Sequence, residues 1–391
     1  MKKSVLFLTN AYPDFDSSYR AVFIKTLAHL LQKEGYKISI VTPKIYKDSH
    51  YSEEQDGIKV YRFPFFSGNK LLIEYNNIPY LRMILYYFTG FFLTIYALLR
   101  NRCQLIHVHW AIPTGLIGVL AGAFLRIPLV VTVHGSDFRL AMDKSSLLKQ
   151  IFLFVCKRAR HINCVSKVMK IEIEQLGIDR EKISTFPMGV DEAFYEEGRN
   201  RQKKLDGSPL TILSNRNLLG IYNVSLLIRA IPMVLKEEPK ARFLIAGDGP
   251  ERKYLEREAK DLNLGSTIQF LGRISHDAMP GLLTQADIYV STSLYDGTSI
   301  SLLEAMASGA FPVVTDIPSN REWVTDGENG FLIPTDEEKF LAKRIVEAIR
   351  DQELLERGRL KNFYIAKKKA LWPITIEKVK EIYTGLLSSK N

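Results

Sequence analysis

The residues most suited to chemistry lie in one stretch of the chain, from Ser291 to Asn320. An apolar run there leads into a short polar loop, and the pattern behind it predicts a helix that begins near Ser299 or Ser301. Backbone N–H groups that are free at a helix start, aided by the helix dipole, bind anions such as a diphosphate. The residues expected to hold such an anion are Gly297, Thr298, Ser299 and Ile300.

Two acids flank this expected helix start. Glu304 falls about one turn into the helix, where its carboxylate can accept hydrogen bonds from two hydroxyls of a ribose. Asp296 precedes the helix and could meet the hydroxyls of a bound sugar. The plain alternative is an ordinary capped helix with Glu304 as a surface acid, but the length of the pattern favours a site. The pair does not resemble that of a glycosidase, whose two carboxyls flank the scissile bond roughly 5–10 Å apart.

The elements that must position these residues follow a regular alternation. Short apolar runs alternate with longer amphipathic stretches, which is typical of βα units around parallel sheets. The alternation stops in the polar stretch Asn200–Pro209 and then restarts. We therefore predict an α/β fold of two Rossmann-like, doubly wound domains, residues 1–199 and 200–371, that face each other across a cleft. Ligands of such sheets bind outside the carboxyl ends of the strands.

The stretch around Glu304 resembles the signature of glycosyltransferase family 4. That signature is a Glu, seven residues, a second Glu, then Ala-Met-Ala-x-Gly and a strand. Glu304 matches the second Glu, and Asp296 stands where the first usually does. The resemblance implies a GT-B fold in which Glu304 holds the ribose of the donor and Asp296 contacts the transferred sugar, with one methylene less reach.

Other segments resemble the same family in the same order, so the resemblance covers nearly the whole chain. The sequence Thr132–Asp137 resembles the family's His-Gly-x-Asp at the reaction cleft, which implies that His134 holds the acceptor or the donor sugar. A histidine at the end of a strand is often structural, but this position favours a site. Phe270–Arg273 resembles the loop on which the nucleotide base rests, so Arg273 is a candidate on the base side.

Two further segments of the resemblance are structural. Ala246–Pro250 resembles the family's AGxGP turn, in which we expect Asp248 to pack or to cap. Trp372 and the apolar residues behind it resemble the family's closing helix, which is expected over 372–391 and packs back onto the first domain.

The chain departs from the family pattern at two loops. The family usually carries Gly-Arg-Leu and then Lys-Gly, in which Arg and Lys bind the donor phosphates. Tyr222 and Asn223 stand in place of Lys-Gly, so Arg216 is the expected phosphate ligand, and the helix start must offset the missing lysine. In the first βα loop Ala21 replaces the usual glycine, and Arg20 could supply charge there.

No metal or other cofactor is expected, and the nucleotide-sugar is a co-substrate. Asp14 and Asp16 have the DxD form found in metal-dependent transferases, but two aspartates one residue apart are common on surfaces. No His/Cys cluster suggests zinc. The three cysteines show neither CxxC spacing nor the density of a disulfide scaffold, and we expect them to be reduced and buried, as in a cytosolic protein: Cys103, Cys156 and Cys164.

The resulting hypothesis is a retaining glycosyltransferase. The resemblance implies front-face attack, with an oxygen of the donor phosphate taking the acceptor's proton. Two alternatives stay open. A nucleotide-sugar epimerase of the same fold would need a water and acid/base carboxylates at the anomeric carbon. A non-catalytic sugar-nucleotide binder is compatible with the altered phosphate ligands.

The basic charge is concentrated in the first half of the chain. Residues 1–200 carry 26 Lys and Arg against 18 Asp and Glu, whereas residues 201–391 carry 27 against 25. The segment Met83–Leu99 is uncharged and aromatic, but shorter than the roughly 20 apolar residues of a membrane span. We expect a cytoplasmic protein, peripheral on the anionic inner membrane face, with a lipid-linked or polysaccharide-precursor acceptor and no nucleic acid. Solvated lysines without a partner are the alternative explanation of the charge.

Overall fold

The computed structural model describes residues 3–15, 18, 20–69, 79–201 and 209–388, and the chain divides into two compact units. The first unit is Met1–Pro187 with Thr375–Asn391, and the second is Met188–Ile374. The first boundary lies at Pro187, ahead of the expected residue 199, because α7 (Glu192–Arg199) packs against the second unit's α10 (Met279–Gln285) and α11 (Ile300–Ala307). Most of the expected linker, residues 202–208, lies outside the described residues.

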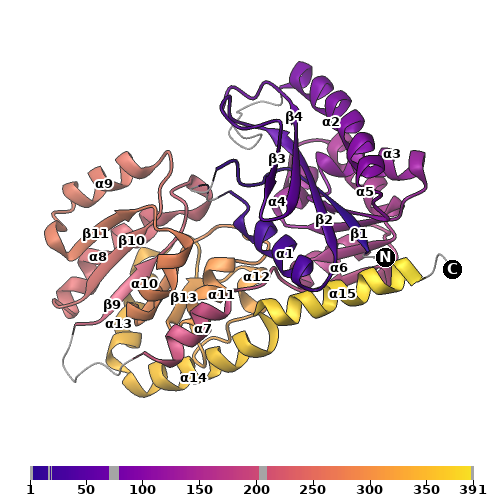
Figure 1. The fold of residues 1–391 in the computed structure, drawn as a ribbon. Coiled ribbons are helices and arrows are strands. Elements are labelled where there is room, and N and C mark those ends of the chain that lie inside the picture. Colours follow the sequence, from indigo (N-terminus) through magenta and orange to yellow (C-terminus); the bar gives the residue numbers. More distant parts are fainter. Residues whose placement is uncertain (1–2, 16–17, 19, 70–78, 202–208, 389–391) are drawn as a thin grey trace. The chain divides into compact units, whose positions relative to one another are not determined.

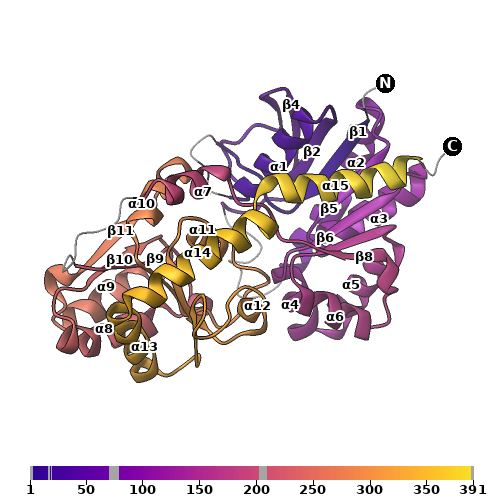
Figure 2. The ribbon, with the colours of Figure 1, turned by 90° about the horizontal axis from the view of Figure 1, so that it is seen from below.

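The first unit is built on an eight-stranded sheet of order β3-β4-β2-β1-β5-β6-β7-β8, parallel except for the β3–β4 pair. Helices pack along its sides, as Figures 1 and 2 show. Its strands are β1 (Ser4–Thr9), β2 (Lys37–Lys44), β3 (Ser52–Gln55), β4 (Ile58–Pro64), β5 (Leu105–His109), β6 (Leu129–Val133), β7 (His161–Cys164) and β8 (Ile183–Thr185). Its helices are α1 (Val22–Lys33), α2 (Tyr80–Arg100), α3 (Thr114–Leu125), α4 (Ser136–Asp143), α5 (Ser146–Arg158), α6 (Lys167–Gln175), η2 (Arg180–Lys182) and α15 (Trp372–Ser388) from Thr375 on.

The second unit is built on a six-stranded parallel sheet of order β11-β10-β9-β12-β13-β14. The predicted fold class is therefore confirmed: both units are α/β, each with a parallel sheet at its core. The strands are β9 (Thr211–Ser214), β10 (Arg242–Ala246), β11 (Ile268–Gly272), β12 (Ile288–Ser291), β13 (Phe311–Thr315) and β14 (Phe331–Ile333). The remaining helices are η3 (Gly220–Tyr222), α8 (Val224–Glu237), α9 (Arg252–Asp261), η4 (Gly265–Thr267), η5 (His276–Ala278), α12 (Pro318–Arg321), α13 (Glu338–Arg350) and α14 (Gln352–Lys369).

Strand order decides which loops meet. The strands β9 and β12 are parallel neighbours, with Ile212 opposite Ile288 and Leu213 opposite Tyr289. Their carboxyl ends therefore lie at the same edge of the sheet, where such sheets bind ligands. In the first unit β5 and β6 are parallel neighbours in the same way.

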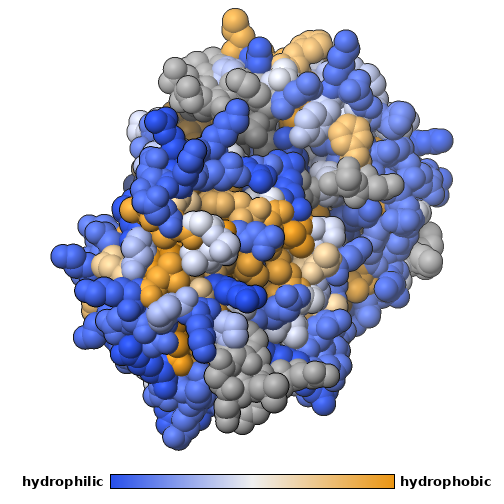
Figure 3. Space-filling model, turned by 90° about the vertical axis from the view of Figure 1, so that its left-hand side faces the viewer, coloured by the Kyte–Doolittle hydropathy of each residue, from blue (hydrophilic) through white to orange (hydrophobic). Residues whose placement is uncertain are grey.

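One helix of the first unit exposes an apolar stripe. Six large apolar side chains on α2 are each more than half exposed, at helical spacing: Leu81, Ile84, Phe88, Phe92, Tyr96 and Leu99. Within the described residues, Leu81–Arg100 is the segment whose length and composition would allow a membrane span, and 28% of the window tested is buried. On the face drawn in Figure 3 hydrophilic residues predominate, and apolar residues gather in a band across the middle.

Ala21, the residue in place of the family's glycine, adopts a glycine-like conformation. It precedes α1 with φ 48° and ψ 37°, in the left-handed region, which costs an L-residue roughly 1–2 kcal/mol. We expect Ala21→Gly to raise the free energy of unfolding by about 0.5–1 kcal/mol, since glycine's greater entropy in the unfolded chain offsets part of the relief. Chemical denaturation of the full chain would measure it. Ala28→Gly, inside the same helix, is the matched control and should destabilise the protein by about 1 kcal/mol or more.

Candidate functional site

The loops after β9 and β12 bring a cation and an acid together in the second unit. Arg216 donates from Nη2 to Asp296 Oδ2 at 2.6 Å and from Nη1 to Ser299 Oγ at 2.6 Å. The Arg216 side chain is 7% exposed and that of Asp296 17%. Burial alone would lower the pKa of Arg216, but Asp296, Tyr289 and Tyr222 together outweigh burial and raise that pKa above its ordinary value. The cluster is thus a guanidinium held in place beside a helix start.

Tyr222, the residue in place of the family's lysine, lies under this guanidinium. Arg216 Cζ lies 4.1 Å from the centroid of the Tyr222 ring, which is cation–π geometry. The Ala246–Pro250 turn holds the arginine's backbone, because a Cβ on Gly247 would come within 2.2 Å of the Arg216 carbonyl oxygen. Gly247 also has φ 135°, a conformation open to glycine. The turn therefore positions the Arg216 loop as well as the sheet edge.

The start of α11 leaves backbone donors open. Ser299 is the N-cap, and its Oγ accepts from Leu302 N at 3.2 Å. Leu303 N donates to the Ser299 carbonyl at 3.1 Å. As in the first turn of any helix, the N–H groups of Ile300 and Ser301 have no acceptor within the helix. These two donors and Arg216 suit an anion. The helix begins at Ile300, within the range expected from the sequence.

Glu304 lies one turn into α11 and is almost fully buried. Its residue is 8% exposed, and burial raises the pKa of its carboxyl from 4.5 to about 8, although Arg216 opposes the shift. The folded state therefore holds a proton that the unfolded chain has lost. Its contribution to the free energy of unfolding falls as the pH rises from about 4.5 to about 8. A buried acid with such a pKa is typical of a functional site rather than of a surface helix.

His134 follows β6 in the first unit, in a loop held by Asp137. The Asp137 carboxylate accepts from the backbone N–H groups of Ala111 at 2.6 Å and of His134 and Gly135 at 3.0 Å each. Burial raises the pKa of Asp137 to about 6, against the effect of these hydrogen bonds. Asp137 thus ties together the loops after β5 and β6.

Aromatic rings fix the plane of the His134 imidazole. Its centroid lies 4.5 Å from that of Trp110 and 5.3 Å from that of Phe23. Trp110 has φ 68°, which is rare for a bulky residue, and donates from Nε1 to Ser136 Oγ at 3.1 Å. Backbone strain of this kind concentrates at binding and catalytic sites. Burial lowers the pKa of His134 to about 3, so the imidazole is neutral at pH 7.

The remaining sequence candidates lie apart from these clusters. Arg273 follows β11, is 56% exposed, and its Nε lies 3.6 Å from Asp248 Oδ2. Asp248 also accepts from Gly249 N at 2.9 Å, a local turn contact. Arg20 is 7% exposed, stacks at 4.4 Å on the Tyr46 ring, and its Nε and Nη1 have no hydrogen-bond partner among the described residues.

The DxD pair is only partly described. Asp14 is buried with its Oδ1 3.6 Å from Arg62 Nε, and burial raises the pKa of its carboxyl. Asp16 lies outside the described residues. Among the residues that are described, no group of three His, Cys, Asp or Glu side chains could hold a metal ion.

Sequence reasoning missed three side chains that the structure brings to these clusters. Tyr222 was noted only for the lysine it replaces. The buried His109, on β5, contacts His134, and the spacing of His107 and His109 on one strand was the available signal, since both then face the same side. The buried Tyr289 on β12 lies close enough to Arg216 for their charges to interact, but it is indistinguishable in sequence from a core residue.

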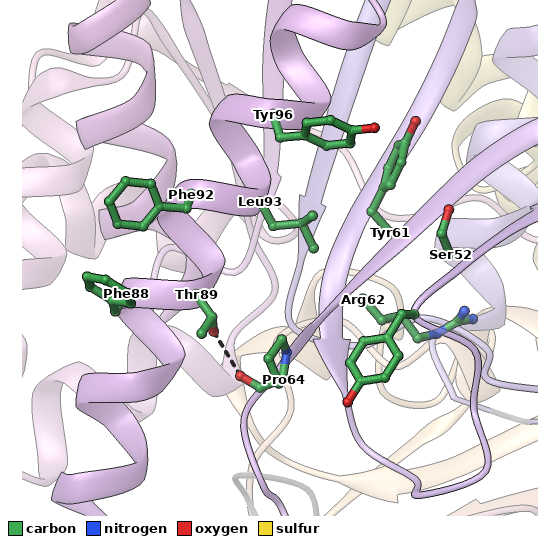
Figure 4. A pocket seen from close by; sticks show the side chains of 10 residues that line it. Ser52, Tyr61, Arg62, Pro64, Phe88, Thr89, Phe92, Leu93 and Tyr96 are labelled. Atoms are coloured by element: carbon green, nitrogen blue, oxygen red, sulfur yellow. Dashed lines mark hydrogen bonds between the residues drawn. The ribbon is translucent and has the colours of Figure 1, made fainter.

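A separate cavity of about 710 Å³ lies between α2 and the β3–β4 hairpin. Figure 4 shows the rings of Phe88, Phe92 and Tyr96 on the helix side, with Tyr61 across from them. The hydroxyl of Thr89, which also lines it, donates to the Pro64 carbonyl at 2.8 Å. The cavity is mainly apolar and contains none of the candidate site residues.

Comparison with known proteins finds similar chains over most of this sequence. The chain is 26% identical over 261 residues to N-acetyl-alpha-D-glucosaminyl L-malate synthase of Bacillus anthracis, covering 65% of this chain and 68% of that protein. It is 27% identical over 319 residues to UDP-Gal:alpha-D-GlcNAc-diphosphoundecaprenol alpha-1,3-galactosyltransferase of Escherichia coli, covering 76% and 80%. The structure of Anabaena HepE in complex with UDP superposes with a TM-score of 0.76 at 18% identity, covering 98% of this chain and 100% of that one.

Two family models match the chain, one in each half. The model described as Glycosyltransferase Family 4 matches residues 21–194, and the one described as Glycosyl transferases group 1 matches residues 196–362. Since the two matches together span nearly all of the chain between its ends, this protein belongs to the family 4 glycosyltransferases of the GT-B fold.

Proposed function

We propose that this glycosyltransferase is retaining and metal-independent, and that it moves a sugar from a nucleotide-sugar to a lipid-linked or polysaccharide-precursor acceptor. The observation that carries the proposal is the cluster of Arg216, Asp296 and Ser299 at the start of α11, with buried Glu304 one turn behind. It offers a cation and two open N–H groups for a diphosphate, and a carboxylate for a ribose.

The donor half of the reaction needs charge stabilisation on the leaving diphosphate. Arg216 is preorganised by Asp296, Ser299 and the Tyr222 ring, so it can meet the developing charge without reorganisation. Asp296, whose carboxylate already faces the guanidinium, is placed to accept from hydroxyls of the sugar. The helix start and Arg216 together take the role of the family's missing lysine.

The acceptor is best argued from the first unit. No Asp or Glu occurs from Tyr75 to Ser136, whereas four arginines do. This acid-free segment includes α2 with its exposed apolar stripe, and the apolar cavity lies beside that helix. A surface of this kind suits an anionic lipid, and the Escherichia coli relative is named for a diphosphoundecaprenol acceptor. The Bacillus anthracis relative is named for malate, so relatives alone do not decide. Peripheral attachment to the cytoplasmic face of a membrane is part of the proposal.

Hydrolysis of donors tests the proposal directly. A panel of labelled UDP-, GDP- and ADP-sugars should contain one whose sugar is slowly released, and the rate should be the same in EDTA because backbone groups and Arg216 neutralise the diphosphate. Arg216→Ala should lower that rate by roughly 10²–10³-fold, the effect of removing one preorganised donor. Arg257→Ala, on the surface helix α9, is the matched control.

Three other results would contradict parts of this proposal. Abolition by EDTA with rescue by manganese or magnesium would contradict metal independence. Interconversion of two donor sugars without release would indicate the epimerase. Binding of a nucleoside diphosphate with no turnover of any donor, with lipid-linked acceptor present, would indicate a non-catalytic binder. The anomeric configuration of a transferred sugar, read by NMR, decides retention against inversion.

A further inference from the structure

We infer that His109 holds His134 in the tautomer that carries its proton on Nδ1, so that His134 serves the reaction as a hydrogen-bond donor and not as a base. The functional part of this inference rests on the proposed function. The positional part rests on the first unit alone.

The two imidazoles are in direct contact. His109 Nδ1 lies 3.1 Å from His134 Nε2, and the two ring planes are 29° apart. His109 is fully buried at the end of β5, and His134 is partly exposed in the loop after β6. One of the two nitrogens must donate and the other must accept.

The other nitrogen of His109 settles the direction. Its Nε2 is buried and has no hydrogen-bond partner among the described residues. A proton there would make a buried N–H without an acceptor, which is rare and costly, whereas an unpaired buried acceptor is tolerated more often. Burial also lowers the pKa of His109 well below its ordinary value, so the ring is neutral and has one proton to place. That proton lies on Nδ1.

The tautomer of His134 follows. His109 Nδ1–H donates to His134 Nε2, which must then be the acceptor, and the neutral His134 ring carries its own proton on Nδ1. Within the described residues His134 Nδ1 has no hydrogen-bond partner. It can donate to an oxygen of the sugar or of the acceptor. A neutral ring whose only lone pair already accepts from His109 cannot take a proton from the acceptor hydroxyl, which leaves that role to another group.

A second layer holds His109 itself in place. The His107 ring stacks on it with centroids 4.3 Å apart and planes 28° apart. His107 in turn is bound at both nitrogens, by the Tyr383 hydroxyl of α15 at 2.5 Å and by Thr132 Oγ1 at 2.8 Å. His109 is therefore a positioning residue with little freedom to rotate.

The tautomer is observable without any substrate. Long-range ¹H–¹⁵N correlation of the full chain with labelled histidine distinguishes the two tautomers at each of its seven histidines. His134→Asn and His109→Asn assign the two signals. We expect both residues as the Nδ1–H form at pH 7. An Nε2–H pattern for His134, or a charged ring, overturns the inference whatever the enzyme does.

Activity tests the positioning role. The side-chain amide of His109→Asn can place a donor near the position of Nδ1, so it should retain the rate of donor hydrolysis. His109→Leu removes the N–H group that donates to His134 and should lower kcat by about tenfold. KM for the nucleotide-sugar should change little, because the residues proposed to bind it lie in the second unit. His161→Leu, at a partly buried histidine of β7, is the control and should leave kcat unchanged.

These experiments distinguish a failure of the inference from a failure of the proposed function. If His109→Leu and His109→Asn lose the same thermal stability and the same activity, the role is structural and the inference is wrong. If the wild-type chain turns over no donor, the proposed function fails, and the NMR result still decides the tautomer.

Discussion

Glu304→Ala should weaken the binding of the cognate nucleoside diphosphate by about 10²-fold at pH 8.5. The substitution removes charge-assisted hydrogen bonds to the two ribose hydroxyls, each worth roughly 1.5–3 kcal/mol. The fold should survive, because a buried carboxyl with a raised pKa contributes no stability at this pH. Calorimetric titration with UDP, GDP and ADP would measure it. Glu256→Ala, on a surface helix of the same unit, should change nothing.

The same residue should make binding depend on pH. Its pKa of about 8 leaves most of the carboxyl protonated at pH 7, and the ribose is bound by the ionised form. Affinity of the wild-type chain should therefore rise by several-fold between pH 7 and pH 8.5, up to about tenfold per pH unit below the pKa, with release of a proton on binding. Glu304→Ala should show a flat profile. If the affinity of the wild-type chain did not depend on pH, or if Glu304→Ala left the affinity unchanged, the assignment of Glu304 to the ribose would be wrong.

The second large effect concerns membranes. We expect the protein to co-sediment with anionic vesicles at low salt, with affinity falling as salt rises, because each arginine near the surface is worth up to about 1 kcal/mol. Phe88→Ser with Phe92→Ser should reduce binding by roughly tenfold or more per residue, since both rings are more than half exposed and would be buried in lipid.

The matched control lies in the other unit. Tyr254 and Tyr364 are similarly exposed, at 59% and 61%, and their replacement by serine should leave vesicle binding unchanged. Equal binding to neutral and anionic vesicles, or none to either at low salt, would reject membrane attachment. The charge of the first half would then act in solubility or in contact with an acidic glycan.

Periodicity predicted most strands of both sheets, because βα alternation is a local property of the chain, but it did not predict the short strands β3 and β14. The family resemblance identified Arg216 and supplied the role of Asp296, and strand order explains why they meet. Their ion pair could not be predicted, since a side-chain contact across 80 residues leaves no periodic signal. The contact of the Tyr222 ring with Arg216 could not be predicted either, because it depends on side-chain conformations in the loop between β9 and α8. The contact between His109 and His134 could not be predicted either, although the spacing of His107 and His109 already placed both on one face of their strand.

The boundary at Pro187 shows a different limit. A polar stretch marks a linker by composition, but packing decides to which unit a helix belongs. The helix α7 precedes the polar stretch in sequence, yet it packs against helices of the second unit. The Ala21 conformation is a third case. Its replacement of glycine was visible in the sequence, whereas the retained left-handed backbone was not, because alanine favours right-handed helix elsewhere.

The position of α15 has a consequence for how the protein is made. The Tyr383 hydroxyl is hydrogen-bonded to His107 in the interior of the first unit, and Lys380 pairs with Glu34 at the surface of that unit. The first unit is therefore completed by residues that leave the ribosome after the whole of the second unit has been synthesised. The second unit is contiguous from Met188 to Ile374, so it can finish folding before the last helix of the first unit has been synthesised. A nascent chain stalled before Thr375 should expose an unfilled core at His107, a natural target for chaperones.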